Sequence, residues 1–253
     1  MCIGESIECY QSFYIYAITN LDEVKDGLLE EIERALEVKL YPPEELRTLV
    51  VNEIRAPRAI VRGGYDPAVN QILLSGKLWC RKTLIHELLH AVSYFTREPR
   101  LFEVLNHERE FIEGLTEFLT GYVLYQRYKN CYSAWISKKY LVCLIASPEK
   151  YVRLFGALAR VLIPLREFIK LYVYNPGTDW FNEYESFLSR YGLEDFLINK
   201  PKKKRKIPTI ILLEDMIVNV LRNRMNEKEV EEFRELLHEA PLDVVLDYGS
   251  MIK

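Results

Sequence analysis

Positions 83 to 95 read Thr83-Leu84-Ile85-His86-Glu87-Leu88-Leu89-His90-Ala91-Val92-Ser93-Tyr94-Phe95, and the expected architecture is organised around this stretch. Its apolar positions recur with the period of a buried helix. Residues four apart lie about 40° from each other around a helix axis, so His86 and His90 project from one face, one turn apart, and can share a metal ion. Glu87 lies about 100° from His86 and would stand beside such an ion. The pattern therefore predicts a buried helix with a metal-binding stripe.

A second helix is expected from residue 108 to about residue 128, and it contains two glutamates one turn apart. Glu113 and Glu117 lie opposite a wide apolar arc. That arc comprises Phe111, Ile112, Leu115, Phe118 and Leu119. A carboxylate on a largely buried helix needs a cation or strong hydrogen-bond donors, and metal binding by Glu113, with Glu117 accepting an imidazole N–H, meets that need. The alternative is that both are solvated acids on a surface helix.

Together these residues predict a hydrolytic zinc site. Catalytic zinc is held by three protein ligands and keeps one position open for water, and a nearby carboxylate can act as general base. His86, His90 and Glu113 are the predicted ligands, and Glu87 is the predicted base. The chain has only 4 His, so two of them at this spacing around a glutamate are hard to attribute to chance. The alternative is that both imidazoles are hydrogen-bonded core residues.

The HExxH pattern, followed after 22 intervening residues by Glu113-Gly114-Leu115-Thr116-Glu117, resembles the gluzincin metallopeptidases, the clan of thermolysin and the zinc aminopeptidases. The resemblance covers residues 45–125. It implies a Zn²⁺ cofactor bound by His86, His90 and Glu113, and peptide-bond hydrolysis through a metal-activated water with Glu87 as general base. It also implies that Glu117 orients a zinc-binding histidine. By the same resemblance, residues 70–75 form the edge strand that binds extended substrate by strand addition.

Two roles are left open by these patterns. The third zinc ligand could instead be His107, because SprT-like proteases combine HExxH with a downstream histidine. We favour Glu113, since His107 lies in a polar setting typical of an exposed helix N-terminus. The donor that stabilises the tetrahedral oxyanion is not identified by spacing. The candidates for it are His107, Tyr94, Tyr122 and Tyr125.

A basic run near the C-terminus suggests a different class of function. It comprises Lys202, Lys203, Lys204, Arg205 and Lys206. Such a run can contact nucleic-acid phosphates or direct a protein to the nucleus. The second hypothesis is therefore a catalytically silent zincin-fold binding protein that contacts nucleic acid through this run. A solvated linker is favoured, because 34 Lys+Arg against 37 Asp+Glu give a net charge of −3. The expected partner is a peptide or protein substrate, and no oligomeric state is indicated.

Composition excludes several other classes. A chain of 253 residues with 49% hydrophobic residues is long and apolar enough for a folded core. Its longest apolar runs, 140–146 and 210–213, fall far short of the roughly 20 residues that cross a bilayer. The N-terminus lacks the pattern of a signal peptide. Five cysteines without a CxxC pair favour free thiols in a reducing compartment. We therefore expect a cytoplasmic protein without a membrane span, or a nuclear one if the host is eukaryotic.

The expected fold class is α+β, with a zincin-like metallopeptidase core at 1–130 and a helical C-terminal region at 131–253. Strands are predicted at 13–18, 46–54, 58–62 and 70–75, with a turn at 63–67. Helices are predicted at 20–36, 83–95, 108–128, 132–146, 148–173 with a kink at Pro164, 179–191 and 210–224. A further helix is predicted to begin at an Asn226 cap with Glu229, and a short final helix is predicted near 241–247.

Overall fold

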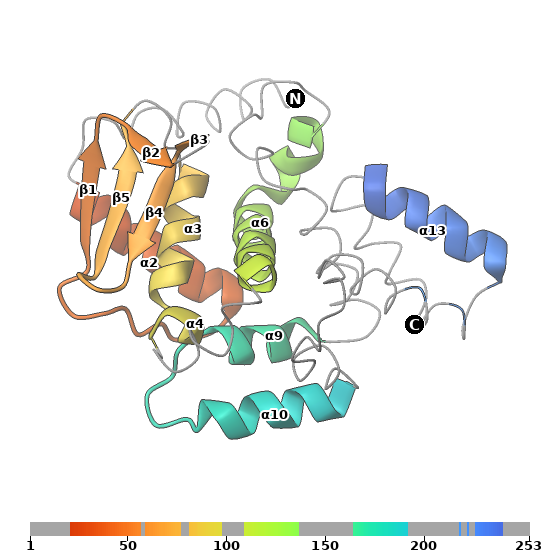
Figure 1. Ribbon diagram of the computed structural model, residues 1–253. Coiled ribbons are helices and arrows are strands. Elements are labelled where there is room, and N and C mark those ends of the chain that lie inside the picture. The colour runs from red at the N-terminus through yellow and green to blue at the C-terminus, as the bar shows by residue number, and fades with distance from the viewer. Residues whose placement is uncertain are drawn as a thin grey trace. The chain divides into compact units, whose positions relative to one another are not determined.

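The computed structural model describes residues 21–56, 59–76, 81–97, 109–136, 164–191, 218, 222 and 226–239. In its first part, helix α2 is followed by the short strands β1 to β5 and then by helix α3, and the described elements after α3 are helices (Figure 1). The predicted α+β class is confirmed. Among the helices described, none is both long and apolar enough to cross a membrane. The predicted strand at 13–18, the basic run at 202–206 and the helix near 241–247 lie outside the described residues.

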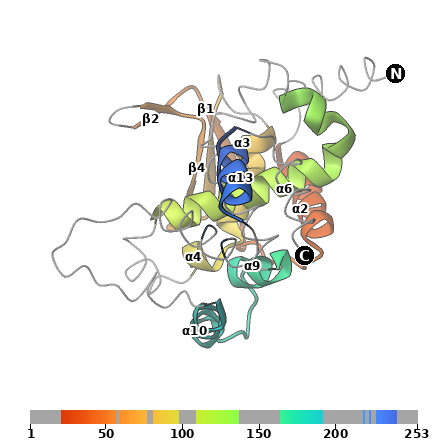
Figure 2. The same ribbon diagram turned by 90° about the vertical axis from the view of Figure 1, so that its right-hand side faces the viewer.

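A three-stranded mixed sheet forms the framework of the first part. Strand β5 (Gln71–Ser75) lies in the middle, parallel to β1 (Arg47–Val51) and antiparallel to β4 (Gly63–Asp66). Strands β2 (Ile54–Ala56) and β3 (Ala59–Val61) form a separate antiparallel pair, and Figure 2 shows β2 projecting away from β1 and β4. The long strand predicted at 46–54 is therefore two shorter ones.

Two predictions about this sheet are wrong. Residues 63–67 were expected to be a turn, but Gly63–Asp66 is strand β4, and the turn follows it at 67–70. Residues 70–75 were expected to be the edge strand, but β5 is paired on both sides. The glycines carry a local turn signal, and the hydrogen bonds of β4 to β5 override it. Within the described sheet the antiparallel edge strand is β4.

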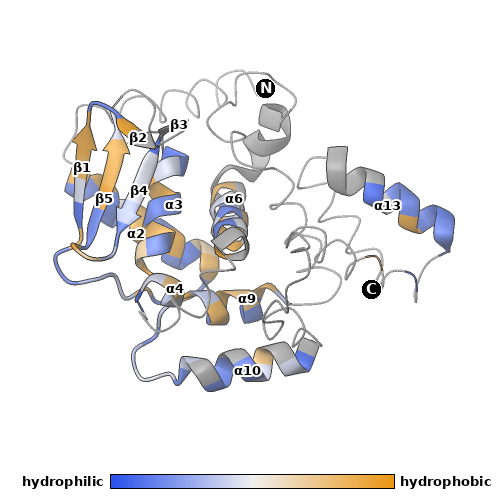
Figure 3. Ribbon diagram, in the orientation of Figure 1, coloured by the Kyte–Doolittle hydropathy of each residue, from blue (hydrophilic) through white to orange (hydrophobic). Residues whose placement is uncertain are grey.

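Helices α2 (Leu21–Leu36) and α3 (Arg81–Ala91) pack on this sheet and on each other, α2 against β1 and α3 against β4 and β5 (Figure 1). Leucine and isoleucine residues that are at most 1% exposed fill the space between them. These are Leu28, Ile32, Ile72, Leu74, Leu84, Ile85, Leu88 and Leu89. The alternation on β5 and the four-residue spacing on α2 explain why these side chains meet. Figure 3 shows the apolar character of β1 and β5.

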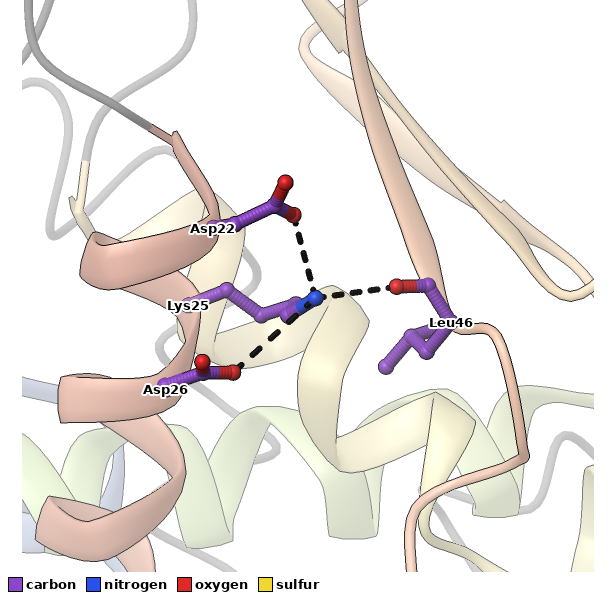
Figure 4. A network of polar contacts seen from close by, with 4 residues as sticks. All are labelled: Asp22, Lys25, Asp26 and Leu46. Carbon is purple, nitrogen blue, oxygen red and sulfur yellow. Dashed lines mark hydrogen bonds and ion pairs between the residues drawn. The ribbon is translucent and has the colours of Figure 1, made fainter.

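Lysine 25 ties the start of α2 to the start of β1 (Figure 4). Its Nζ donates to the Leu46 carbonyl at 3.0 Å and to Asp22 Oδ1 at 3.1 Å, and it lies 3.9 Å from Asp26 Oδ1. The Lys25 side chain is only 13% exposed, whereas both aspartates are largely solvated. The backbone contact therefore positions the chain between α2 and β1, and the two acids balance the charge of the ammonium group.

Helix α6 (Arg109–Ile136) continues beyond residue 128, where its end was predicted. The chain divides into two compact units, residues 1–103 with 119–147 and residues 104–118 with 148–253, and the continuous helix α6 contributes residues to both. The predicted domain division at residue 130 stays a prediction.

In the second unit, α9 (Leu165–Tyr172) and α10 (Trp180–Tyr191) pack together. Trp180 donates its indole N–H to the Leu171 carbonyl at 2.9 Å, and the rings of Phe168 and Phe187 lie 6.1 Å apart. Pro164 has extended backbone (φ −56, ψ 136) and is the N-cap of α9, so α9 begins directly after it. The part of the predicted helix at 148–163 lies outside the described residues.

Helix α13 (Glu227–Glu239) is mostly hydrophilic (Figure 3) and confirms the predicted capping box. Glu229 N–H donates to Asn226 Oδ1 at 3.0 Å, and Asn226 N–H donates to Glu229 Oε2 at 2.9 Å. This reciprocal pair satisfies two backbone donors at the helix start.

Candidate metal centre

The two predicted histidine ligands project from one side of α3. His86 Nε2 and His90 Nε2 lie 3.1 Å apart, with the ring planes inclined at 75°. Two ring nitrogens this close need a proton or a cation between their lone pairs. Two nitrogens bound to tetrahedral zinc at 2.0–2.1 Å would be roughly 3.3 Å apart. The spacing of the imidazoles is therefore close to the spacing that a shared zinc ion requires.

Glu113 on α6 is the third member of this group. One potential ligand atom from each of His86, His90 and Glu113 lies within 4.8 Å of the others. His90 is buried, and the other two are half-buried. Two imidazole nitrogens and one carboxylate oxygen form a donor set that suits catalytic zinc. The residues present fit the predicted metal, and the three predicted ligands are brought together.

The backbone carbonyl of His90 is held by the residues that follow α3. It accepts hydrogen bonds from Ser93 N–H at 3.1 Å, from Ser93 Oγ at 3.0 Å and from Thr96 Oγ1. These donors satisfy a carbonyl at the end of the helix. The helix predicted to reach residue 95 therefore ends at Ala91, and α4 (Tyr94–Arg97) follows as a separate turn. The second histidine is positioned by this hydroxyl-rich helix end.

The predicted base, Glu87, is 7% exposed and lies on the side of α3 that faces β4. Its neighbours there are Thr83, one turn earlier on α3, and the backbone of Gly63. A buried carboxylate on the helix that carries both histidines agrees with the predicted role. Whether it acts as a base stays a prediction.

A buried ion pair lies at the start of the histidine-bearing helix. Arg81 donates to a Glu31 carboxylate oxygen on α2, and their side chains are only 5% and 7% exposed. A positive residue at a helix N-terminus opposes the helix dipole, so the carboxylate compensates both that effect and the burial of the guanidinium. This pair joins α3 to α2.

For the residue predicted to orient a ligand and for the candidate oxyanion donors, the structure gives less support than for the three predicted ligands. Glu117 is buried on α6, at 5% exposure, one turn after Glu113, and its contact with a ligand histidine stays a prediction. Tyr122 follows Glu113 by nine residues, which places it on the opposite side of α6, about 13.5 Å along the axis. Tyr94 is 2% exposed at the start of α4. His107 and the side chain of Tyr125 lie outside the described part.

Tyr65 on β4 was not among the residues predicted from the sequence to serve the site. Tyr65 shares a strand face with Gly63, because residues two apart on a strand point the same way, and that face meets α3. Its hydroxyl donates to Asn70 Oδ1 at 3.2 Å. Burial raises its pKa, the Arg97 charge opposes this, and Asp66 adds to it. No role was predicted for this residue, because the preceding Gly63-Gly64 pair resembles a turn.

Comparison of the chain with protein-family models, with curated proteins and with solved structures finds no match. The gluzincin resemblance therefore depends on the HExxH pattern and on the second helix with its two glutamates.

Proposed function

We propose that this protein is a zinc-dependent peptidase. The single observation that supports the proposal is the convergence of His86, His90 and Glu113, whose ligand atoms lie within 4.8 Å of one another. A buried carboxylate, Glu87, follows the first of these ligands in the sequence. A donor set of three with a neighbouring acid is typical of hydrolytic zinc enzymes, whereas structural zinc usually has four protein ligands.

A zinc ion held there would act as a Lewis acid that polarises a carbonyl and lowers the pKa of a water. The remaining chemistry belongs to the side chains. His86, His90 and Glu113 would hold the cation, and the backbone of His90 is further fixed through its carbonyl. Glu87 accepts a proton from the attacking water and delivers it to the leaving amine. Glu117 is the expected acceptor for a ligand N–H.

Extended substrate would pair with β4 rather than with β5. The described sheet ends at β4, and β5 is already paired on both sides. An edge strand can add an extended peptide through backbone hydrogen bonds. Because β4 also lies against Glu87, substrate bound along it would run past the proposed base. This choice replaces the strand named from the sequence.

The decisive experiment combines metal analysis with hydrolysis of casein and of a peptide library. We expect about one zinc per chain and hydrolysis by the wild type, and loss of hydrolysis with zinc retained in Glu87→Gln, because the amide keeps the shape of the side chain but cannot accept the proton. Stoichiometric zinc without hydrolysis by the wild type would instead support a zinc-dependent binding protein. Absence of zinc binding would refute the metal centre itself.

A second pair of variants tests the third ligand. Glu113→Ala should lose zinc, and His107→Ala should keep it. The reverse result would support the SprT-like arrangement in place of the gluzincin-like one.

A further inference from the structure

Gly63, the first residue of β4, lies against the side chains of Thr83 and Glu87 on α3. A Cβ atom built at Gly63 would lie 2.6 Å from Thr83 Cγ2 and 3.2 Å from both Cγ and Oε1 of Glu87. Carbon atoms in favourable contact are about 3.5–4.0 Å apart. The volume that a single methyl group needs at this position is already occupied by Thr83 and Glu87.

The glycine is not required here by backbone conformation. Among the described glycines, Gly177 is the one with positive φ, and Gly63 pairs with Leu74 in regular antiparallel register. An alanine could adopt the backbone of Gly63. The next residue provides the contrast, because a Cβ built at Gly64 meets nothing within 4 Å. The requirement at position 63 is therefore the absence of a side chain, and it is specific to the strand face that meets α3.

Glu87 has little room to move away from this contact. It is 7% exposed, and Thr83, one turn earlier on the same side of α3, is 8% exposed. The bare backbone of β4 thus forms one wall of the space that holds the Glu87 side chain. Displacing that wall by one methyl group would change the side-chain conformation of Glu87, the distance between β4 and α3, or both.

We propose that Gly63 is a positioning residue for Glu87, whose carboxylate is held against the side-chain-free backbone of β4. The kinetic consequence rests on the proposed peptidase function. The atoms nearest to the Cβ of an alanine at position 63 would belong to Thr83 and Glu87. Gly63→Ala should therefore lower proton transfer by Glu87 more than it lowers zinc binding.

The test compares zinc-loaded Gly63→Ala with Gly64→Ala, the same substitution on the adjacent residue of the same strand. We expect Gly63→Ala to retain one zinc per chain, to keep its KM within about twofold, and to lose roughly 10–100-fold in kcat, as small misplacements of a catalytic group do. Gly64→Ala adds the same methyl group to the strand proposed to bind substrate but away from Glu87, so it should retain zinc and keep a kcat well above that of Gly63→Ala. Equal kcat for the two variants would overturn the proposal.

A double variant separates positioning from simple destabilisation. Thr83→Ser removes Cγ2, the closest atom, and leaves both contacts with Glu87 in place. In Gly63→Ala/Thr83→Ser we expect Tm to return toward that of Thr83→Ser alone while kcat stays low. Recovery of kcat together with Tm would show that the loss came from general displacement of the strand, and would overturn the proposal. The double variant also replaces Gly63→Ala if that protein does not fold.

Crystal structures supply a readout that needs no activity. The Glu87 carboxylate should change its position in Gly63→Ala, or in the double variant, and should keep it in Gly64→Ala. If the wild type hydrolyses no peptide, the proposed function fails, and this comparison still decides the role of Gly63. An unmoved carboxylate would contradict it.

Discussion

Replacing Glu31 by glutamine should destabilise the protein far more than an ordinary change on a helix. Glu31 and Arg81 form an ion pair whose side chains are 7% and 5% exposed. Glutamine keeps the size of the side chain but removes the charge that the guanidinium contacts. Breaking a buried pair by removing one partner costs about 3–5 kcal/mol. For a chain of this size each kcal/mol lowers Tm by about 2–4 °C. The expected loss is therefore roughly 6–20 °C.

The assay is thermal unfolding followed by circular dichroism, in EDTA so that metal binding does not contribute to Tm. Glu30→Gln is the matched control, because Glu30 is the adjacent residue of the same helix and is exposed. It should change stability by no more than about 0.5 kcal/mol. The double variant Glu31→Leu/Arg81→Met removes both charges and should recover most of the loss. If Glu31→Gln lowers Tm no more than Glu30→Gln does, the buried pair does not stabilise the junction of α2 and α3.

Three further predictions concern the metal centre and β4. Zinc at about 100 times its Kd should stabilise the protein by about 2.7 kcal/mol relative to EDTA, seen as a higher Tm in thermal unfolding, and this increase should vanish in His90→Ala. Glu117→Gln should lower zinc affinity about 10–100-fold if Glu117 orients a ligand. The folded state holds the pKa of Tyr65 above its ordinary value of 10.0, so its contribution to stability should be fully present below pH 10.0 and be lost as the pH rises further. The Tm of the wild type should consequently fall more steeply above that pH than the Tm of Tyr65→Phe, and parallel curves would contradict the assignment.

Local patterns predicted the helices of the site well. The one-turn spacing of His86 and His90 and the opposing apolar positions specify which face of α3 is polar, because helix periodicity is a property of neighbouring residues. The Asn226 capping box was predicted for the same reason, since both of its hydrogen bonds join residues three apart. The end of α3 was missed, because the hydroxyls of Ser93 and Thr96 compete for a backbone acceptor that helical periodicity does not reveal.

The errors in the sheet have a different cause. Gly63 and Gly64 carry a turn signal, but the pairing of β4 with β5 and the close approach of α3 determine their conformation. The central place of β5 depends on β1, which lies more than twenty residues earlier in the chain. Strand order is set by such distant hydrogen bonds, and short-range signals cannot report them.

The sequence by itself determined the chemical character of the candidate site: two imidazoles one turn apart, an acid beside the first, and two acids on a second buried helix. These features follow from helix geometry and residue type alone. Only the tertiary structure decided which strand forms the edge and that Glu87 lies against the bare backbone of Gly63. The physical reason is that strand order and the approach of α3 to β4 arise from packing between segments far apart in the chain, and only that packing sets how closely a carboxylate and a backbone can approach.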